Sequence, residues 1–264
     1  NGLAIAALAE TGAYFERPDL VEAAVAAADL LVRLHLDEHA RLFRTSKDGR
    51  AGANAGVLED YADVAEGFLA LASVTGEGVW LDFAGLLLDH VLTRFTDDSG
   101  SLYDTAADAE RLIRRPQDPT DNATPSGWTA AAGALLSYAA HTGSEPHRTA
   151  AEHALGVVKA LGPRVPRFIG WGLAAAEALL DGPREVAVVG PDLGDGATRG
   201  LHRTALLGTA PGAVVAVGAE GSDEFPLLAG RPLVGGAPAA YVCRNFTCDA
   251  PTTDPERLRT ALDS

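Results

Sequence analysis

Four carboxylic acids in two parts of the chain have the residue types that acid–base chemistry requires. Glu59 and Asp60 stand together at the start of an apolar helical pattern, and Asp104 and Asp118 lie in a later acidic segment. Cleavage of a glycosidic bond uses two such groups, one protonated to donate a proton and one ionised to receive it. If the chain is catalytic, we expect these four residues to carry out the acid–base steps.

The same carboxylates also have a purely structural interpretation. Long acidic loops are often solvated, or they are tied down by internal Arg–Asp pairs and helix caps. Asp60 stands where its side chain would cap the following helix, which is the commonest use of an aspartate at such a position. Glu59 would then remain free for a ligand, so capping and ligand binding are compatible.

Five further residues are candidates for holding a substrate beside these acids. An arginine can clamp a carboxylate or phosphate with two parallel hydrogen bonds, and aromatic rings can stack on the faces of sugars. Helix N-termini present free N–H groups and partial positive charge to anionic or hydroxyl-rich ligands. On these grounds the predicted substrate-binding residues are Asn1, Tyr61, Arg115, Ser126 and Trp128.

The two cysteines of the chain, Cys243 and Cys248, are separated by four residues. That spacing is too long for the usual redox pair, and two ligands do not make a zinc site. Three interpretations stay open: two buried thiols, a reversible disulfide, and a site on the redox path of a partner domain. So few cysteines exclude a disulfide-rich secreted scaffold and make the cytoplasm the default expectation.

Composition and spacing argue against several other classes of protein. The net charge is −15 and no cluster of lysine and arginine exists, so nucleic-acid binding is not expected. No apolar run approaches the roughly 20 residues of a membrane span. The histidines lack metal-ligand spacing, and Gly190, Gly194 and Gly196 do not fit a dinucleotide fingerprint. We therefore expect no metal and no cofactor.

A repeated helical hairpin positions the candidate residues. A helix that ends at Thr-Gly, followed by a second helix, occurs at Thr11-Gly12, Thr75-Gly76 and Thr142-Gly143. The expected helices cover residues 3–9, 20–34, 61–74, 81–95, 128–141 and 147–161. Tight turns join the two helices of each pair, and long loops at 37–59 and 96–127 join one pair to the next. The long loops must then meet at one end, at the N-termini of the first helices, which makes that end the expected working face.

Stacked hairpins of this length predict a mostly α fold, a curved array that forms a partial (α/α) toroid. The pattern changes near residue 182, where strand-like runs at 185–190, 213–217 and 239–243 alternate with helical ones at 199–207 and 255–262. We therefore expect a toroid segment of three hairpins over 1–181 and a small α/β subdomain over 182–264.

Several short motifs are jointly specific for one family. They are NGLAIAAL at 1–8, LEDYA at 58–62, DTAAD at 104–108, RPQD at 115–118, ATPSG at 123–127 and AYVCRNFTC at 240–248. Together they resemble the C-terminal portion of the thioredoxin domain-containing family that includes spermatogenesis-associated protein 20. Family members tend to carry Asn after Pro-Ser-Gly, where this chain has Trp128, so a ligand contact made by that Asn would be altered.

The resemblance implies a thioredoxin-like domain upstream, then a toroid similar to six-hairpin glycosidases and N-acylglucosamine 2-epimerases. It makes this chain the back part of a longer protein. The expected partners are the missing N-terminal half, with the thioredoxin-like domain and the first toroid hairpins, or a second chain that carries it. The leading functional hypothesis is a toroid that binds or processes a sugar-like molecule. The alternative is a non-catalytic scaffold or redox-linked module for the thioredoxin-like domain.

Overall fold

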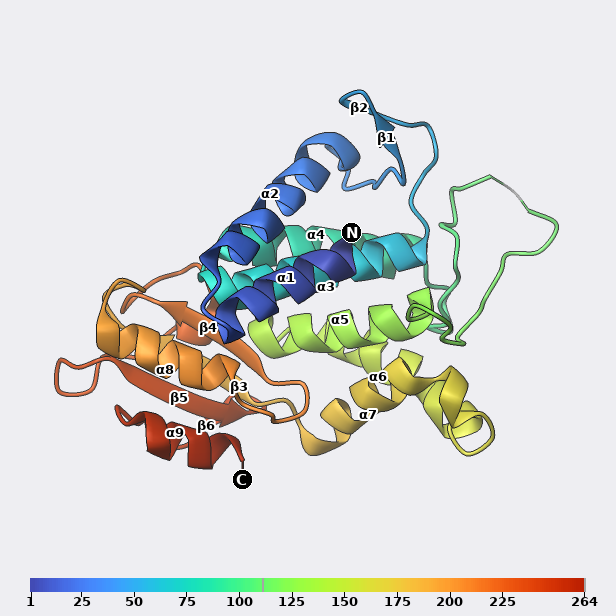
Figure 1. The fold of residues 1–264 in the computed structure, drawn as a ribbon. Coiled ribbons are helices and arrows are strands. Elements are labelled where there is room, and N and C mark those ends of the chain that lie inside the picture. The colour runs from blue at the N-terminus through green and yellow to red at the C-terminus, as the bar shows by residue number, and fades with distance from the viewer. Residues whose placement is uncertain (111, 264) are drawn as a thin grey trace.

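The computed structural model describes residues 1–110 and 112–263, and most of them are helical. Helices α1 to α7 span Gly2–Tyr14, Pro18–His35, Leu58–Thr75, Gly78–Arg94, Gly127–Thr142, Glu145–Leu161 and Gly170–Asp181. Helices α1, α3 and α5 lie side by side, with α2, α4 and α6 packed against them from outside (Figure 1). This arrangement confirms the predicted fold class, and α7 adds a further helix against α5 that the three-hairpin prediction did not include.

Two of the three Thr-Gly pairs end a helix as predicted. Gly76 and Gly143 follow α3 and α5 with φ of 73°, the left-handed conformation that glycine adopts at no steric cost. Gly12 behaves differently, because α1 continues through it to Tyr14. The prediction that the first helix stops at Thr11-Gly12 was therefore wrong: Gly12 is buried within α1, where a Cβ would lie 2.6 Å from the Val21 side chain.

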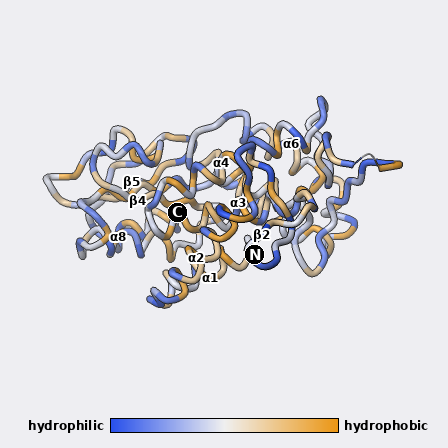
Figure 2. Tube along the Cα trace, turned by 90° about the horizontal axis from the view of Figure 1, so that it is seen from above, coloured by the Kyte–Doolittle hydropathy of each residue, from blue (hydrophilic) through white to orange (hydrophobic). Residues whose placement is uncertain are grey.

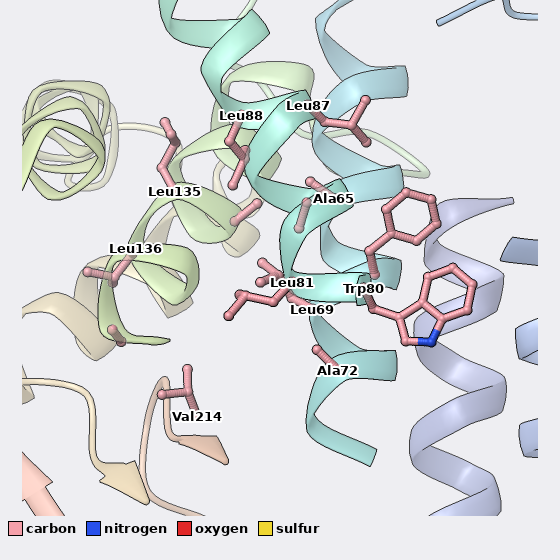
Figure 3. Close-up of a cluster of buried hydrophobic side chains, with 14 of the residues drawn as sticks. Ala65, Leu69, Ala72, Trp80, Leu81, Leu87, Leu88, Leu135, Leu136 and Val214 are labelled. Carbon is pink, nitrogen blue, oxygen red and sulfur yellow. The ribbon is translucent and has the colours of Figure 1, made fainter. Parts of the chain in front are cut away.

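The inner helices α3 and α5 approach closely at their first turns because α5 begins with a glycine. A Cβ added to Gly127, the first residue of α5, would lie 2.7 Å from the backbone nitrogen of Glu59 in α3. Farther along these helices, the core is filled by larger side chains from α3, α4 and α5. Leu69, Trp80, Leu88 and Leu135 lie in it, with Val214 from the neighbouring sheet (Figure 3).

The C-terminal part contains a four-stranded sheet. Strands β3 (Glu185–Val189), β4 (Val214–Gly218), β5 (Ala239–Arg244) and β6 (Thr247–Cys248) form it in the order β4-β3-β5-β6. The β3–β4 pair is parallel, and the β3–β5 and β5–β6 pairs are antiparallel. Helices α8 (Gly196–Leu206) and α9 (Pro255–Leu262) connect and close this unit, and its order of strands and helices agrees with the sequence pattern.

The sheet shares a core with the toroid helices. Side chains on one face of the sheet, among them Ala187, Val214 and Tyr241, belong to the same buried cluster as α3 and α5. The opposite face, with Val186, packs with α8 and α9 in a second cluster. Alternation of residues between the two faces of a strand explains the division. Seen from above, strands β4 and β5 are drawn largely in the hydrophobic colours, whereas α8 carries hydrophilic stretches (Figure 2).

Two connecting segments frame the end of the molecule where α3 and α5 begin. The first long loop contains a short ribbon of β1 (Ser46–Lys47) and β2 (Arg50–Ala51). The second runs from α4 to α5, and both lie at the end where α3 and α5 start (Figure 1). This confirms the expected placement of the long loops. No helix within the described residues is long and apolar enough to cross a membrane.

Candidate functional site

A depression of about 300 Å³ opens between the N-termini of α3 and α5 and the second long loop. Its lining includes Glu59 from α3, Asp104 and Asp118 from the loop, and Ser126 before α5. Thr120, Asn122 and Thr124 contribute polar side chains beside them. The structure thus brings together three of the four predicted acids and one of the predicted binding residues.

The loop and the start of α3 are joined by backbone hydrogen bonds. The Leu58 N–H donates to the Asp104 carbonyl oxygen at 2.9 Å, which fixes the loop against the first turn of α3. The Asp104 N–H in turn donates to the carbonyl of Pro116 at 2.9 Å. The hydrogen bond between Leu58 and Asp104 therefore fixes the position of Asp104 relative to Glu59, the residue after Leu58.

Asp104 is the carboxylic acid whose protonation the site alters most clearly. Partial burial raises the pKa of Asp104, and the nearby charges of Asp118 and Glu59 raise it further. A hydrogen bond from the Asp118 N–H, at 3.4 Å, opposes this shift only in part. A carboxylic acid whose pKa is raised holds its proton to a higher pH, which suits it to donate a proton.

The other two acids of the depression hold loop residues by their side chains. Asp118 accepts hydrogen bonds from the backbone nitrogen and the hydroxyl of Thr120, at 3.0 and 2.5 Å. The Thr124 hydroxyl lies 3.4 Å from a Glu59 oxygen. Glu59 lies in the first turn of α3, where the partial charge of the helix favours a negatively charged group.

Asp60 serves the structure of α3 rather than the depression. Its carboxylate accepts a hydrogen bond from the Val57 N–H at 2.8 Å and pairs with Arg44 at 2.9 Å. It therefore stands in the first turn of the helix and satisfies a backbone donor just before it. The expected capping role is realised from inside the helix, with Val57 and not Asp60 at the N-cap position.

Four of the predicted binding residues lie outside the lining of the depression. Tyr61 is 2% exposed, accepts a hydrogen bond from the Leu42 N–H at 2.9 Å and stacks on His90 with ring centroids 4.9 Å apart. Trp128 points toward α6, where its indole N–H donates to the Ala154 carbonyl at 2.8 Å. Asn1 is exposed at the start of α1 and makes no side-chain cap.

Arg115 acts as an internal brace of the second long loop. Within the described residues, its guanidinium donates to the carbonyl oxygens of Thr105 and Arg94, at distances of 2.7 to 2.9 Å. It also lies 4.1 Å above the Tyr103 ring. These contacts set the shape of the loop that carries Asp104 and Asp118, while the predicted clamping of a substrate stays a prediction.

Asp121 is a key residue that the sequence did not single out. It is buried and accepts hydrogen bonds from the Ser126 N–H, the Thr129 hydroxyl and the Trp171 N–H, at 3.0, 2.5 and 2.8 Å. It thereby joins the loop, the start of α5 and the start of α7. The sequence signal was weak, because several aspartates of this loop precede the same helix.

We expect Asp121→Ala to lower the free energy of unfolding by roughly 3 kcal/mol, because it leaves the buried Thr129 hydroxyl and the partly buried N–H groups of Ser126 and Trp171 without this acceptor. Urea denaturation of the variant, followed by circular dichroism, measures this change. Asp98→Ala, in an exposed loop, is the matched control and should stay within about 0.5 kcal/mol of the parent. Equal stability of the two variants would show that Asp121 does not hold the three segments together.

The two cysteines form a disulfide between β5 and β6. Cys243 and Cys248 stand opposite each other in the antiparallel register of this pair. The interpretation as two buried thiols is therefore wrong for this structure. Among the described residues, no group of three or more His, Cys, Asp or Glu side chains is arranged to hold a metal ion.

Comparison with known proteins identifies relatives over nearly the whole chain. Spermatogenesis-associated protein 20 of Homo sapiens is 30% identical over 279 residues, which cover 99% of this chain and 35% of that protein. The Mus musculus protein is 29% identical over 280 residues, with the same coverage. The chain is similar in sequence, over nearly all of its length, to a part of spermatogenesis-associated protein 20. It spans about a third of the length of these relatives, and no family model matches it.

A solved structure supports the toroid fold. Cellobiose 2-epimerase from Spirochaeta thermophila DSM 6192 superposes with a TM-score of 0.53 at 18% identity, covering 68% of this chain and 53% of the epimerase. At this identity the likeness establishes the fold alone. The family resemblance and the toroid architecture predicted from the sequence are thus both confirmed.

Proposed function

We propose that the depression between α3, α5 and the second long loop binds a sugar or sugar-like ligand and carries out acid–base chemistry on it. The observation that carries the proposal is the meeting of Glu59, Asp104 and Asp118 in one depression. Sugars present many hydroxyl groups, and carboxylates with threonine and asparagine side chains are suitable hydrogen-bonding partners for them. The toroid shared with cellobiose 2-epimerase is in keeping with this ligand class.

Each acid has a distinct role in this proposal. Asp104, whose pKa is raised, donates a proton to an oxygen of the ligand. Glu59 stands at the positive end of α3 and receives a proton as the ionised partner. The negative charge of Asp118 contributes to the raised pKa of Asp104, and Thr120 holds the Asp118 carboxylate in place. In hydrolysis, Asp104 protonates the departing glycosidic oxygen while Glu59 takes a proton from the water whose oxygen bonds to the anomeric carbon. In epimerisation, Glu59 takes the proton from the carbon next to the carbonyl of the open-chain sugar while Asp104 protonates the carbonyl oxygen, and return of a proton to the other face of that carbon restores the carbonyl.

Titration calorimetry of the full-length protein with a panel of mono- and disaccharides tests the proposal. We expect at least one sugar to bind, and Glu59→Gln to weaken its binding by at least about tenfold, since a hydrogen bond to a charged group is lost. Glu22→Gln, on the outer helix α2, is the matched control and should bind like the parent.

Absence of binding across the panel, or equal binding by Glu59→Gln, would instead favour the non-catalytic alternative. In that case the toroid would act as a scaffold or redox-linked module for an upstream thioredoxin-like domain. The internal bonds of Arg115 and the buried position of Tyr61 are compatible with that role, because they stabilise the fold without a ligand.

A further inference from the structure

The disulfide at the edge of the sheet joins two sulfur atoms in very different surroundings. Cys243 lies in the central strand β5 and is 1% exposed. Cys248 lies in β6, a two-residue edge strand with both residues exposed. A thiolate from solution can therefore approach the sulfur of Cys248, whereas the body of the protein covers the sulfur of Cys243. Such asymmetry directs thiol–disulfide exchange to one of the two sulfurs.

A single arginine lies against both sulfur atoms. The Arg231 Nη2 is 3.3 Å from the Cys243 Sγ and 3.2 Å from the Cys248 Sγ. Its other terminal nitrogen donates to the carbonyl oxygens of Leu227 and Ala229, which hold the guanidinium in place. A fixed positive charge at this distance does little for a neutral disulfide, but it strongly favours a thiolate.

Glu185 completes the surroundings of the hairpin. It is 3% exposed, stands opposite Cys243 in the β3–β5 register and accepts a hydrogen bond from the Phe246 N–H at 2.7 Å. This bond anchors the two-residue turn between β5 and β6, where Asn245 and Phe246 both have positive φ. The turn is thus held by hydrogen bonding as well as by the disulfide, so opening the disulfide leaves the hairpin with an anchor.

We propose that the Cys243–Cys248 pair is a thiol–disulfide exchange site, reduced by a dithiol that attacks Cys248 first and releases Cys243 as a thiolate beside Arg231. In the first step a dithiol thiolate forms a bond to the Cys248 Sγ, and the bond between Cys243 and Cys248 breaks. The electron pair of that bond stays on Cys243. In the second step the other thiolate of the dithiol displaces Cys248, and the dithiol leaves as its own disulfide. Two electrons pass to the cysteine pair, and the two thiol protons of the reductant go to water or to the cysteines.

The first test maps the site of attack in the full-length protein under native conditions. The protein is exposed to glutathione, quenched with iodoacetamide and digested for peptide mass analysis. We expect the glutathione adduct on Cys248 and the carbamidomethyl group on Cys243. An adduct mainly on Cys243, or a disulfide that opens only when the protein is unfolded in guanidinium chloride, would overturn the proposal.

The second test examines Arg231. We expect Arg231→Gln to slow reduction by dithiothreitol about tenfold, as for a leaving thiol whose pKa rises by roughly one to two units. Arg259→Gln, the control, removes a cation of α9 that pairs with Glu256. Its disulfide should be reduced at the same rate as that of the parent. Unchanged or faster reduction of folded Arg231→Gln contradicts the role of the guanidinium. If circular dichroism shows that this variant does not fold, the position of the glutathione adduct in the parent protein alone tests the proposal.

Discussion

Asp104→Asn is expected to lower turnover of the bound sugar by at least about a hundredfold without lowering the stability of the protein at pH 7. The loss follows from removal of the proton donor, since general acid catalysis typically contributes two to four orders of magnitude. The amide keeps the size of the side chain and its acceptor oxygen for the Asp118 N–H. Turnover is measured on the full-length protein with the sugar that calorimetry identifies.

The expected stability of Asp104→Asn follows from the direction in which folding shifts the pKa of Asp104. The pKa of Asp104 is raised in the folded chain, so its ionisation costs folding free energy. The stability that the protonated acid contributes is present at low pH and is lost as pH rises through the folded-state pKa. An asparagine cannot ionise, so the variant should become more stable relative to the parent as pH rises through that range.

Asp98→Asn is the control for Asp104→Asn, because it removes an equal charge from an exposed position in the loop after α4. It should retain full turnover. A structural role for Asp104 predicts the opposite pattern: a large loss of unfolding free energy at pH 7 with turnover reduced only in proportion to unfolded protein. Urea denaturation from pH 4 to pH 8 separates the two cases.

The second large effect is expected for Gly127→Ala. The new methyl group would lie 2.7 Å from the Glu59 backbone nitrogen and 3.1 Å from the Leu58 Cβ, so α3 and α5 must move apart at their first turns. Overpacking of this kind costs about 1–3 kcal/mol of unfolding free energy. Because Leu58 also holds Asp104 through its N–H, the same movement should weaken sugar binding.

Gly156→Ala provides a closely matched comparison. It makes the same substitution in α6, where a Cβ would meet nothing within 4 Å. Alanine is the better helix former, so this variant should gain up to about 1 kcal/mol. If thermal and urea unfolding show Gly127→Ala to be as stable as Gly156→Ala, the close approach of α3 and α5 does not limit the fold, and the inferred link between helix packing and the depression fails.

The fold could be predicted well because its elements repeat. Thr75-Gly76 and Thr142-Gly143 mark real helix ends, since glycine alone adopts the left-handed cap without strain. Thr11-Gly12 is the same dipeptide, but α1 continues through it to Tyr14, and Gly12 packs closely against Val21 of the next helix. Helix α7 was harder to predict, since no second helix follows it to complete the repeat.

The site could be predicted only in part. Glu59, Asp104 and Asp118 meet as expected, because helix N-termini and long loops lie at one end of a toroid. The aromatic candidates illustrate the limit of such an inference. Tyr61 and Trp128 both lie in the first turn of a helix, but their side chains point away from the depression. The Tyr61 hydroxyl binds the Leu42 N–H, and the Trp128 indole binds the Ala154 carbonyl. Sequence position fixes the end of the molecule at which a residue lies, while the direction of its side chain depends on packing.

The core that the sheet shares with α3 and α5 limits how this protein can be divided or exchanged. A chimaera that joins residues 1–181 to a foreign domain would leave the side of α3 and α5 that meets Val214 uncovered. A fragment of 182–264 would likewise expose the sheet face that carries Tyr241. Recombination between relatives should therefore keep the helical part and the sheet of one parent together.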